Sequence, residues 1–176
     1  MDLKEKTLSR EIAYEGSFLK IEKDTVLVPN GNKSKREIVR HPGACAVVAF
    51  KDGKIMLERQ YRYALDETIL EIPAGKKDKG ETDIECAARE LEEESGYKAN
   101  DLKFLGTVYS SVGFCDEKVS IFEAHNLEES HTNFDSDEII ELEYYSVDEV
   151  LKMIKDGVIK DGKTVAAMGL YLINQK

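Results

Sequence analysis

The sequence predicts an α/β (α+β) fold, and three patterns support this prediction. Residues 9–30 alternate loosely between apolar and polar side chains, and the turn-forming PNGNKS precedes a second extended stretch, REIVRH. The apolar run ACAVVAF at residues 44–50 is short and uninterrupted, as in a buried strand. Two capping-box sequences, Thr82–Glu85 and Ser146–Glu149, each predict the start of a helix.

Local signals also predict the elements that follow residue 43. The run at 44–50, the Asp52-Gly53 turn and the stretch IMLERQYRY form a predicted hairpin, and LEIPAG is typical of a short strand ended by proline and glycine. The first helix should run from Thr82 to Gly96. Its core-facing stripe should comprise Ile84, Ala87, Ala88 and Leu91.

The rest of the chain continues this alternation of strands, loop and helices, with no internal repeat. A second helix is expected to end near Gly157. The predicted elements are strands at 102–111 and 118–127, a polar loop at 127–146, and helices at 146–157 and 164–175.

Composition and charge exclude several functional classes. Among 176 residues, 35 are acidic and 25 are basic, which gives a net charge of −10 and argues against nonspecific binding to nucleic acid or an anionic membrane. The apolar runs are too short to cross a bilayer, and the charged N-terminus lacks the apolar core of a signal peptide. The 3 cysteines form no CxxC pair and have no histidine spaced for a zinc site. We therefore expect a cytoplasmic protein with no nucleic-acid or membrane partner.

The first predicted helix carries several carboxylates close together. Glu90, Glu93 and Glu94 are related by three and four positions, so they share an arc of roughly 100°. Each like-charged pair should destabilise the helix by about 0.2–0.5 kcal/mol, and Arg89 is the only basic residue between Glu81 and Glu94. A hard divalent cation such as Mg²⁺ or Mn²⁺ would compensate for the repulsion. The alternative is a solvated acidic face without metal.

Residues 75–97 resemble a complete Nudix box, the signature of hydrolases that act on nucleoside diphosphates linked to another group. Gly75, Glu81 and the run RELEEESGY at 89–97 satisfy its fixed positions. The resemblance implies the Nudix fold, a mixed β-sheet sandwiched between helices, with an antiparallel β-sheet element at the N-terminus. It also implies metal-assisted hydrolysis, with Mg²⁺ as the cofactor and Mn²⁺ as a substitute.

The same resemblance implies roles for individual residues. The metal ligands would be Glu90, Glu94 and the carbonyl of Ala74, and Glu93 would be a further ligand or a base. Arg89 would orient the glutamate carboxylates. Glu81 would support the start of the helix.

The resemblance extends to about residues 9–174 and points to the ADP-ribose pyrophosphatase branch. The stretches RHPGACAVV, RQYRYA, LEIPAGK and GFCDEKVSIFEA are similar to segments of that branch. It implies a homodimer in which an N-terminal β-strand element, residues 1–40, contributes to the interface, beside a Nudix hydrolase domain at 41–176. The substrate would be a nucleoside diphosphate sugar, cleaved at its pyrophosphate bond.

Several residues outside the box are candidates for binding that substrate. Tyr14 and Phe18 could stack on the adenine, or could be core residues of a strand. Arg40 and Arg62 could contact the phosphates or terminal ribose, or form surface salt bridges. Glu71 could bind a ribose hydroxyl. These candidate substrate-binding residues are Arg40, Arg62, Glu71, Tyr14 and Phe18.

The catalytic base is expected on the loop that precedes the second helix. By resemblance to the branch, Glu138 would position or deprotonate the attacking water, and Asp137 and Glu141 are neighbours that stay open. His41 is expected to be structural, because the sequence places no carboxylate as its partner.

One departure from the branch bears on the substrate. Many ADP-ribose enzymes carry a proline where this chain has Val112, within YSSVGF. Another nucleoside diphosphate sugar, such as GDP-mannose, therefore stays an alternative to ADP-ribose. A non-catalytic Nudix module that senses an ADP-ribose-type ligand is a second alternative.

Overall fold

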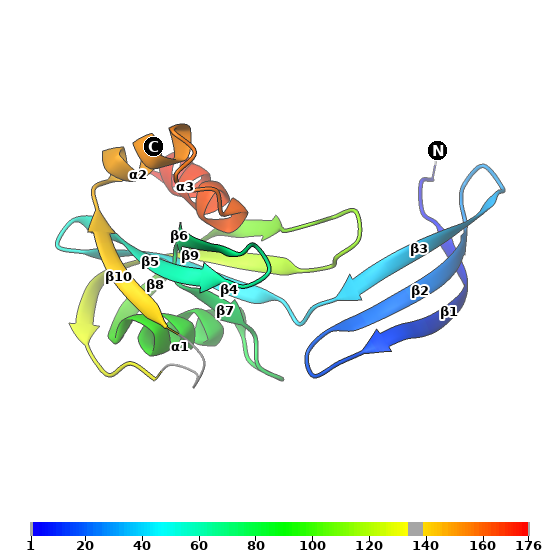
Figure 1. The fold of residues 1–176 in the computed structure, drawn as a ribbon, viewed down its shortest axis with the longest axis horizontal. Coiled ribbons are helices and arrows are strands. Elements are labelled where there is room, and N and C mark those ends of the chain that lie inside the picture. Colours follow the sequence, from blue (N-terminus) through cyan, green and yellow to red (C-terminus); the bar gives the residue numbers. More distant parts are fainter. Residues whose placement is uncertain (1, 134–138, 176) are drawn as a thin grey trace. The chain divides into compact units, whose positions relative to one another are not determined.

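The computed structural model describes residues 2–133 and 139–175, and the chain divides into two compact units. Unit 1 consists of Met1–Gly43 with Tyr109–Lys118, and unit 2 of Ala44–Val108 with Val119–Lys176. Figure 1 shows the elements of both units.

Unit 1 is built on a three-stranded antiparallel sheet. In spatial order its strands are β1 (Lys6–Glu15), β2 (Lys20–Leu27) and β3 (Lys33–Arg40). Every residue of β1 is exposed, whereas β2 buries two carboxylates, Glu22 and Asp24. Arg40 pairs with Glu22 at 2.8 Å and Arg10 with Asp24 at 2.8 Å. Each of the two buried carboxylates of this sheet therefore has an arginine partner.

Unit 2 contains a mixed sheet in the order β10-β5-β4-β9-β8, with β6 paired to β5 and β7 paired to β4. β4 pairs in parallel with β9 and antiparallel with β5 and β7, which makes the sheet mixed. The strands are β4 (Ala44–Lys51), β5 (Lys54–Arg62), β6 (Glu67–Glu71), β7 (Ala74–Lys76), β8 (Tyr97–Tyr109), β9 (Lys118–Glu129) and β10 (Ile140–Tyr145).

Helices cover both faces of this sheet, as Figure 1 shows: α1 lies on one face, and α2 and α3 on the other. Their bounds are α1 (Asp83–Ser95), α2 (Val147–Lys155) and α3 (Gly162–Asn174). Successive residues of β4 point into different cores. Cys45 and Val47 pack with Leu91 of α1, whereas Ala46 and Val48 belong to the core under α2 and α3. The expected sheet between helices, with a separate antiparallel sheet, is confirmed.

The predicted capping boxes are present at both helix starts. Thr82 and Glu85 exchange the reciprocal side-chain and backbone hydrogen bonds at α1, and Ser146 and Glu149 do so at α2. Gly96 ends α1 in the left-handed region, at φ 72°, where glycine is favoured.

Two expectations about local structure are wrong. Ile84 is 51% exposed, although it lies on the same side of α1 as Leu91, because the core does not cover the helix's first turn at this position. Cys86, which the predicted stripe did not include, is buried. Ile140–Tyr145, expected within a loop, is strand β10, which pairs with β5 from Ile140↔Gln60 to Tyr145↔Ile55. Strand pairing between distant segments is not visible in local sequence.

The helices of the described residues are short. Within the described parts of the chain, none of them is long and apolar enough to cross a membrane.

Candidate functional site

Arg89 donates hydrogen bonds to several carboxylates in and near the acidic helix α1. Its Nε and Nη2 donate to the two oxygens of Glu81 at 2.8 and 3.0 Å. Its Nη1 donates to Glu90 at 2.8 Å and to Glu93 at 3.0 Å, and Nη2 also donates to the carbonyl of Lys76 at 3.0 Å. One guanidinium therefore compensates for much of the repulsion between the glutamates.

Glu81 is the firmest partner of Arg89. The hydrogen bond from Arg89, together with one from the backbone N–H of Asp78, lowers the pKa of Glu81 to about 2 despite its partial burial. Glu81 is therefore ionised throughout the neutral range and keeps Arg89 oriented toward Glu90 and Glu93.

Glu94 is held on the sheet side of α1. It is only 4% exposed, and one carboxylate oxygen accepts a hydrogen bond from the backbone N–H of Ala74 at 2.8 Å. Ala74 begins β7 and pairs with Ala46 of β4. Ala74 and Glu94, which the family resemblance gives as metal ligands, are therefore in contact through the Ala74 N–H.

Gly75 is required by the close approach of Glu90. A Cβ at position 75 would lie 2.1 Å from Cδ of Glu90 and 2.2 Å from both of its carboxylate oxygens. Any side chain at this position would displace the carboxylate. The first glycine of the box therefore forms a cradle for Glu90.

The donor set fits a hard divalent cation. Glu90, Glu93 and Glu94 offer oxygen atoms only, and the Ala74 carbonyl would add another, which is the chemistry that Mg²⁺ and Mn²⁺ prefer. Across residues 2–133 and 139–175, no group of three or more Asp, Glu, His or Cys side chains is arranged as a preformed metal site. Arg89 instead engages two of these carboxylates.

A second charged array lies on β5 and β6. Arg62 Nε donates to Glu71 at 2.6 Å, and Lys163 of α3 pairs with the other oxygen of Glu71, which is 1% exposed. Glu58 is the Cα partner of Glu71 across the two strands. Although burial lowers the pKa of Arg62, the hydrogen bond to Glu71 and the charges of Glu71, Glu94 and Glu58 raise it. Arg62 and Glu71 thus lie near Glu94.

Unit 1 holds the other substrate-binding candidates. Arg40 donates to Glu22 at 2.8 Å and to Asp116 at 3.0 Å. Tyr14 and Phe18 are 56% and 60% exposed, so their alternative interpretation as core residues is wrong. Both rings present apolar surface to solvent within this unit.

His41 has acidic neighbours that sequence reasoning missed. Its backbone N–H donates to Asp116 at 2.8 Å, and its Nδ1 lies 3.6 Å from Glu117. Both carboxylates belong to the stretch GFCDEKV, which pairs with the end of β3 through Val39 and Cys115. The expectation that His41 lacks a carboxylate partner is therefore wrong.

The expected base Glu138 and its neighbour Asp137 lie outside the described residues. Glu141 is exposed on β10, where Arg59 of β5 is its Cα partner across the two strands. Val112, the departure from the ADP-ribose branch, is 82% exposed in unit 1.

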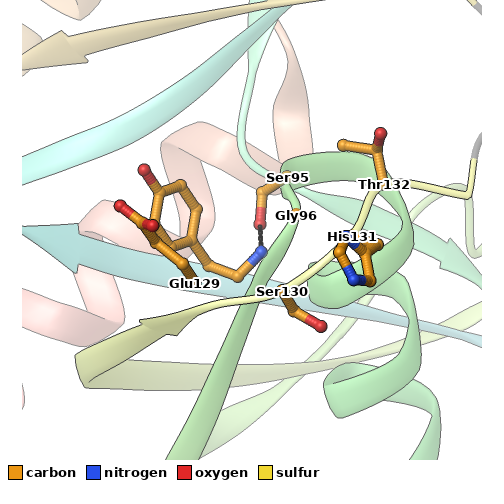
Figure 2. A pocket seen from close by; sticks show the side chains of 7 residues that line it. Ser95, Gly96, Glu129, Ser130, His131 and Thr132 are labelled. Carbon is orange, nitrogen blue, oxygen red and sulfur yellow. Dashed lines mark hydrogen bonds between the residues drawn. The ribbon is translucent and has the colours of Figure 1, made fainter.

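The segment after β9 is attached to the end of α1. Ser130 donates from its backbone to Gly96 at 2.7 Å and from its hydroxyl to Glu92 at 2.6 Å. The N–H of Asn133 donates to the carbonyl of Glu93 at 3.0 Å. A hollow of about 440 Å³ lies at this attachment, and Figure 2 shows the side chains that line it. It is lined by Ser95, Gly96, Tyr97, Glu129, Ser130, His131 and Thr132. No local motif in the sequence predicts this attachment, because it joins residues that are far apart in the chain.

Two family models together match almost the whole chain. Residues 39–168 match the NUDIX domain, and residues 5–39 match the nucleoside diphosphate sugar hydrolase N-terminal domain. The chain is similar to the ADP-ribose pyrophosphatase of Bacillus subtilis, with 43% identity covering 94% of this chain and 91% of that protein. It is also similar to the methanol dehydrogenase activator of Bacillus methanolicus, with 44% identity covering 93% and 90% of the two chains.

Two weaker similarities are also to hydrolases. A GDP-mannose pyrophosphatase of Cronobacter sakazakii is 31% identical over 76% of this chain and 75% of its own. A solved structure titled as an ADP compounds hydrolase superposes with a TM-score of 0.88 and 25% identity, covering 98% and 96% of the two chains. With an intact box and a model match over most of its length, the chain belongs to the NUDIX family.

Proposed function

We propose that this protein hydrolyses the pyrophosphate bond of ADP-ribose to give AMP and ribose 5-phosphate. One observation carries the proposal: Arg89 draws Glu81, Glu90 and Glu93 together beside the Gly75 cradle. The similarity to ADP-ribose pyrophosphatases over both units supports this choice of substrate.

We assign the reaction to the carboxylates of α1. Nudix hydrolases generally need a divalent metal, and Mg²⁺, with Mn²⁺ as a substitute, would neutralise the pyrophosphate and lower the pKa of an attacking water. Glu90, Glu93, Glu94 and the Ala74 carbonyl would hold it. Arg89 keeps the carboxylates of Glu90 and Glu93 oriented, and the Ala74 N–H fixes one oxygen of Glu94.

The proton and the substrate require further groups. Glu138 would accept the proton of the attacking water, and Arg62 would donate to a phosphate or ribose oxygen while Glu71 and Lys163 keep it in place. Arg40 is a second candidate for the phosphates. Tyr14 and Phe18, exposed and aromatic, are suited to stacking on adenine.

We propose a homodimer in which residues 1–40 contribute to the interface. Strand β1 is exposed along its whole length and carries Leu8 and Ile12, apolar side chains at 43% and 53% exposure. Such an edge strand is normally covered. Light scattering should give twice the chain mass at micromolar concentration, and a monomer would remove the dimer, with any substrate contact across it, from the proposal.

The cytoplasm is the compartment that we propose. Cys45, Cys86 and Cys115 are free cysteines, the usual state of thiols in a reducing compartment.

The direct test is product release from a panel of ADP-ribose, ADP-glucose, GDP-mannose, NADH and diadenosine polyphosphates, each with Mg²⁺ and with EDTA. We expect ADP-ribose to be cleaved fastest and only with metal, because the carboxylates cannot by themselves neutralise a pyrophosphate. Faster cleavage of GDP-mannose would favour the alternative sugar nucleotide. If nothing in the panel is cleaved, hydrolysis of these substrates is wrong and the ligand-sensing module becomes the favoured interpretation.

Single carboxylate-to-amide variants separate the roles within the site. Glu93→Gln and Glu138→Gln should each lower kcat by about 10²–10⁴-fold, the usual range for loss of an acid-base group, without unfolding the protein. Glu141→Gln is the matched control, since Glu141 is exposed on β10, and its kcat should stay near that of the unmodified protein. A reversed order, with Glu141→Gln inactive and Glu138→Gln active, would exchange the two assignments.

Gly75→Ala tests the cradle. The added methyl group would displace the Glu90 carboxylate, and an ångström of misplacement should lower kcat by about 10²-fold with circular dichroism unchanged. Gly169→Ala in α3 is the control, because a Cβ there meets no atom within 4 Å and should leave kcat unchanged. Full activity of Gly75→Ala would show that Glu90 does not need this position.

A further inference from the structure

Glu92 belongs to the run of glutamates on α1 but points away from the candidate metal ligands. At about 100° per residue, its side chain leaves the helix about 160° around the axis from those of Glu90 and Glu94. Arg89 donates its hydrogen bonds to Glu90 and Glu93 on the other side. The candidate metal site therefore does not explain why the chain places a fourth carboxylate here.

The carboxylate of Glu92 binds two residues from other segments of the chain. Its Oε1 accepts a hydrogen bond from the hydroxyl of Ser130 at 2.6 Å, and the Lys98 ammonium lies 3.1 Å from the same oxygen. A hydrogen bond to a charged acceptor is stronger than one between neutral groups. The Lys98 side chain is 57% exposed, so water screens its charge. The Ser130 hydroxyl is therefore the firmer partner of Glu92.

The segment that contains Ser130 also binds the backbone at the end of α1. The last carbonyl groups of a helix have no partner within the helix. The N–H of Asn133 donates to the carbonyl of Glu93 at 3.0 Å, and the N–H of Ser130 donates to that of Gly96 at 2.7 Å. Figure 2 shows Ser130 beside Gly96. Together with the bond to Glu92, these contacts fasten the last turn of α1 to residues 130–133.

Strand β7 holds the same turn from the opposite side. Glu94, which is 4% exposed, accepts a hydrogen bond from the N–H of Ala74 at 2.8 Å. Because Glu92 and Glu94 point about 160° apart, β7 and residues 130–133 hold the turn between them. Helix ends otherwise fray. Two carboxylates that we assign to the cation, those of Glu93 and Glu94, lie in this turn.

We propose that Ser130 and Glu92 are positioning residues that fix the last turn of α1, and with it the places where Glu93 and Glu94 present their carboxylates to the divalent cation. This inference rests on the proposed function, in which those carboxylates hold the metal. Ser130 and Glu92 act through the helix and are not themselves ligands. Outer partners of metal ligands typically change metal affinity by about 10–100-fold. We expect the lower end, because the backbone hydrogen bonds of residues 130–133 remain when a side chain is removed.

The test measures Mn²⁺ binding to the full-length protein without substrate, by electron paramagnetic resonance of the free ion. Ser130→Ala should raise the Kd for Mn²⁺ about tenfold. The variant changes no charge, so the effect would come from position alone. Ser130→Thr keeps the hydroxyl group and should restore the Kd of the unmodified protein. Asn100→Ala is the matched control, because it removes a 2.7 Å hydrogen bond to Glu128 between β8 and β9, also without a change of charge.

Glu92→Ala is an independent variant that removes the other side of the contact. It should raise the Kd for Mn²⁺ at least as much as Ser130→Ala does. Adding Ser130→Ala to it should raise the Kd no further, because both residues act through one contact. Amide hydrogen exchange should locate the change: in Ser130→Ala the last turn of α1 should exchange faster, while the first turn, held by the Thr82 capping box, should not.

The outcomes distinguish this inference from the proposed function. An unchanged Kd in folded Ser130→Ala would overturn the inference, as would a loss that Ser130→Thr does not restore or that Asn100→Ala shares. If the unmodified protein binds no Mn²⁺, the metal assignment is wrong and this inference falls with it. If it binds Mn²⁺ but cleaves no substrate in the panel, only hydrolysis is wrong, and the Kd values still support or overturn the positioning roles.

Discussion

The structure of the site depends on one guanidinium held among carboxylates. Arg89 bonds to Glu81, Glu90 and Glu93 at once, so charges that would otherwise repel along α1 share a common counter-ion. Because the pKa of Glu81 is about 2, its carboxylate stays charged and attracts Arg89 across the whole neutral pH range. The protein itself thus holds the carboxylates of Glu90 and Glu93 in place, through hydrogen bonds from Arg89.

Sequence reasoning succeeded where the determining interactions are local. The capping boxes at Thr82 and Ser146, and the left-handed Gly96, follow from chemistry within a few residues, and all are present. The stripe on α1 was predicted with its correct direction but too far toward the N-terminus, since the exposure of Ile84 depends on where the core ends. Strand β10 was missed because its stability comes from pairing with β5 rather than from its own sequence.

The same division applies to the site. Spacing along one helix is enough to place Glu90, Glu93 and Glu94 on one side, and the family resemblance added Arg89 to this candidate site. The anchor that Lys163 provides for Glu71 joins residues 92 positions apart, and the attachment of Ser130 to Glu92 joins residues 38 apart. No motif encodes such contacts, because only the folded sheet brings their elements together.

Strand β4 divides the main unit into two interiors, with Cys45 and Val47 on the α1 side and Ala46 and Val48 on the other. Side chains alternate along a strand, so one inserted or deleted residue would exchange these two sets. Small and large side chains would then meet the wrong helices. An insertion or deletion is therefore better tolerated in the turns that flank β4 than within the strand itself.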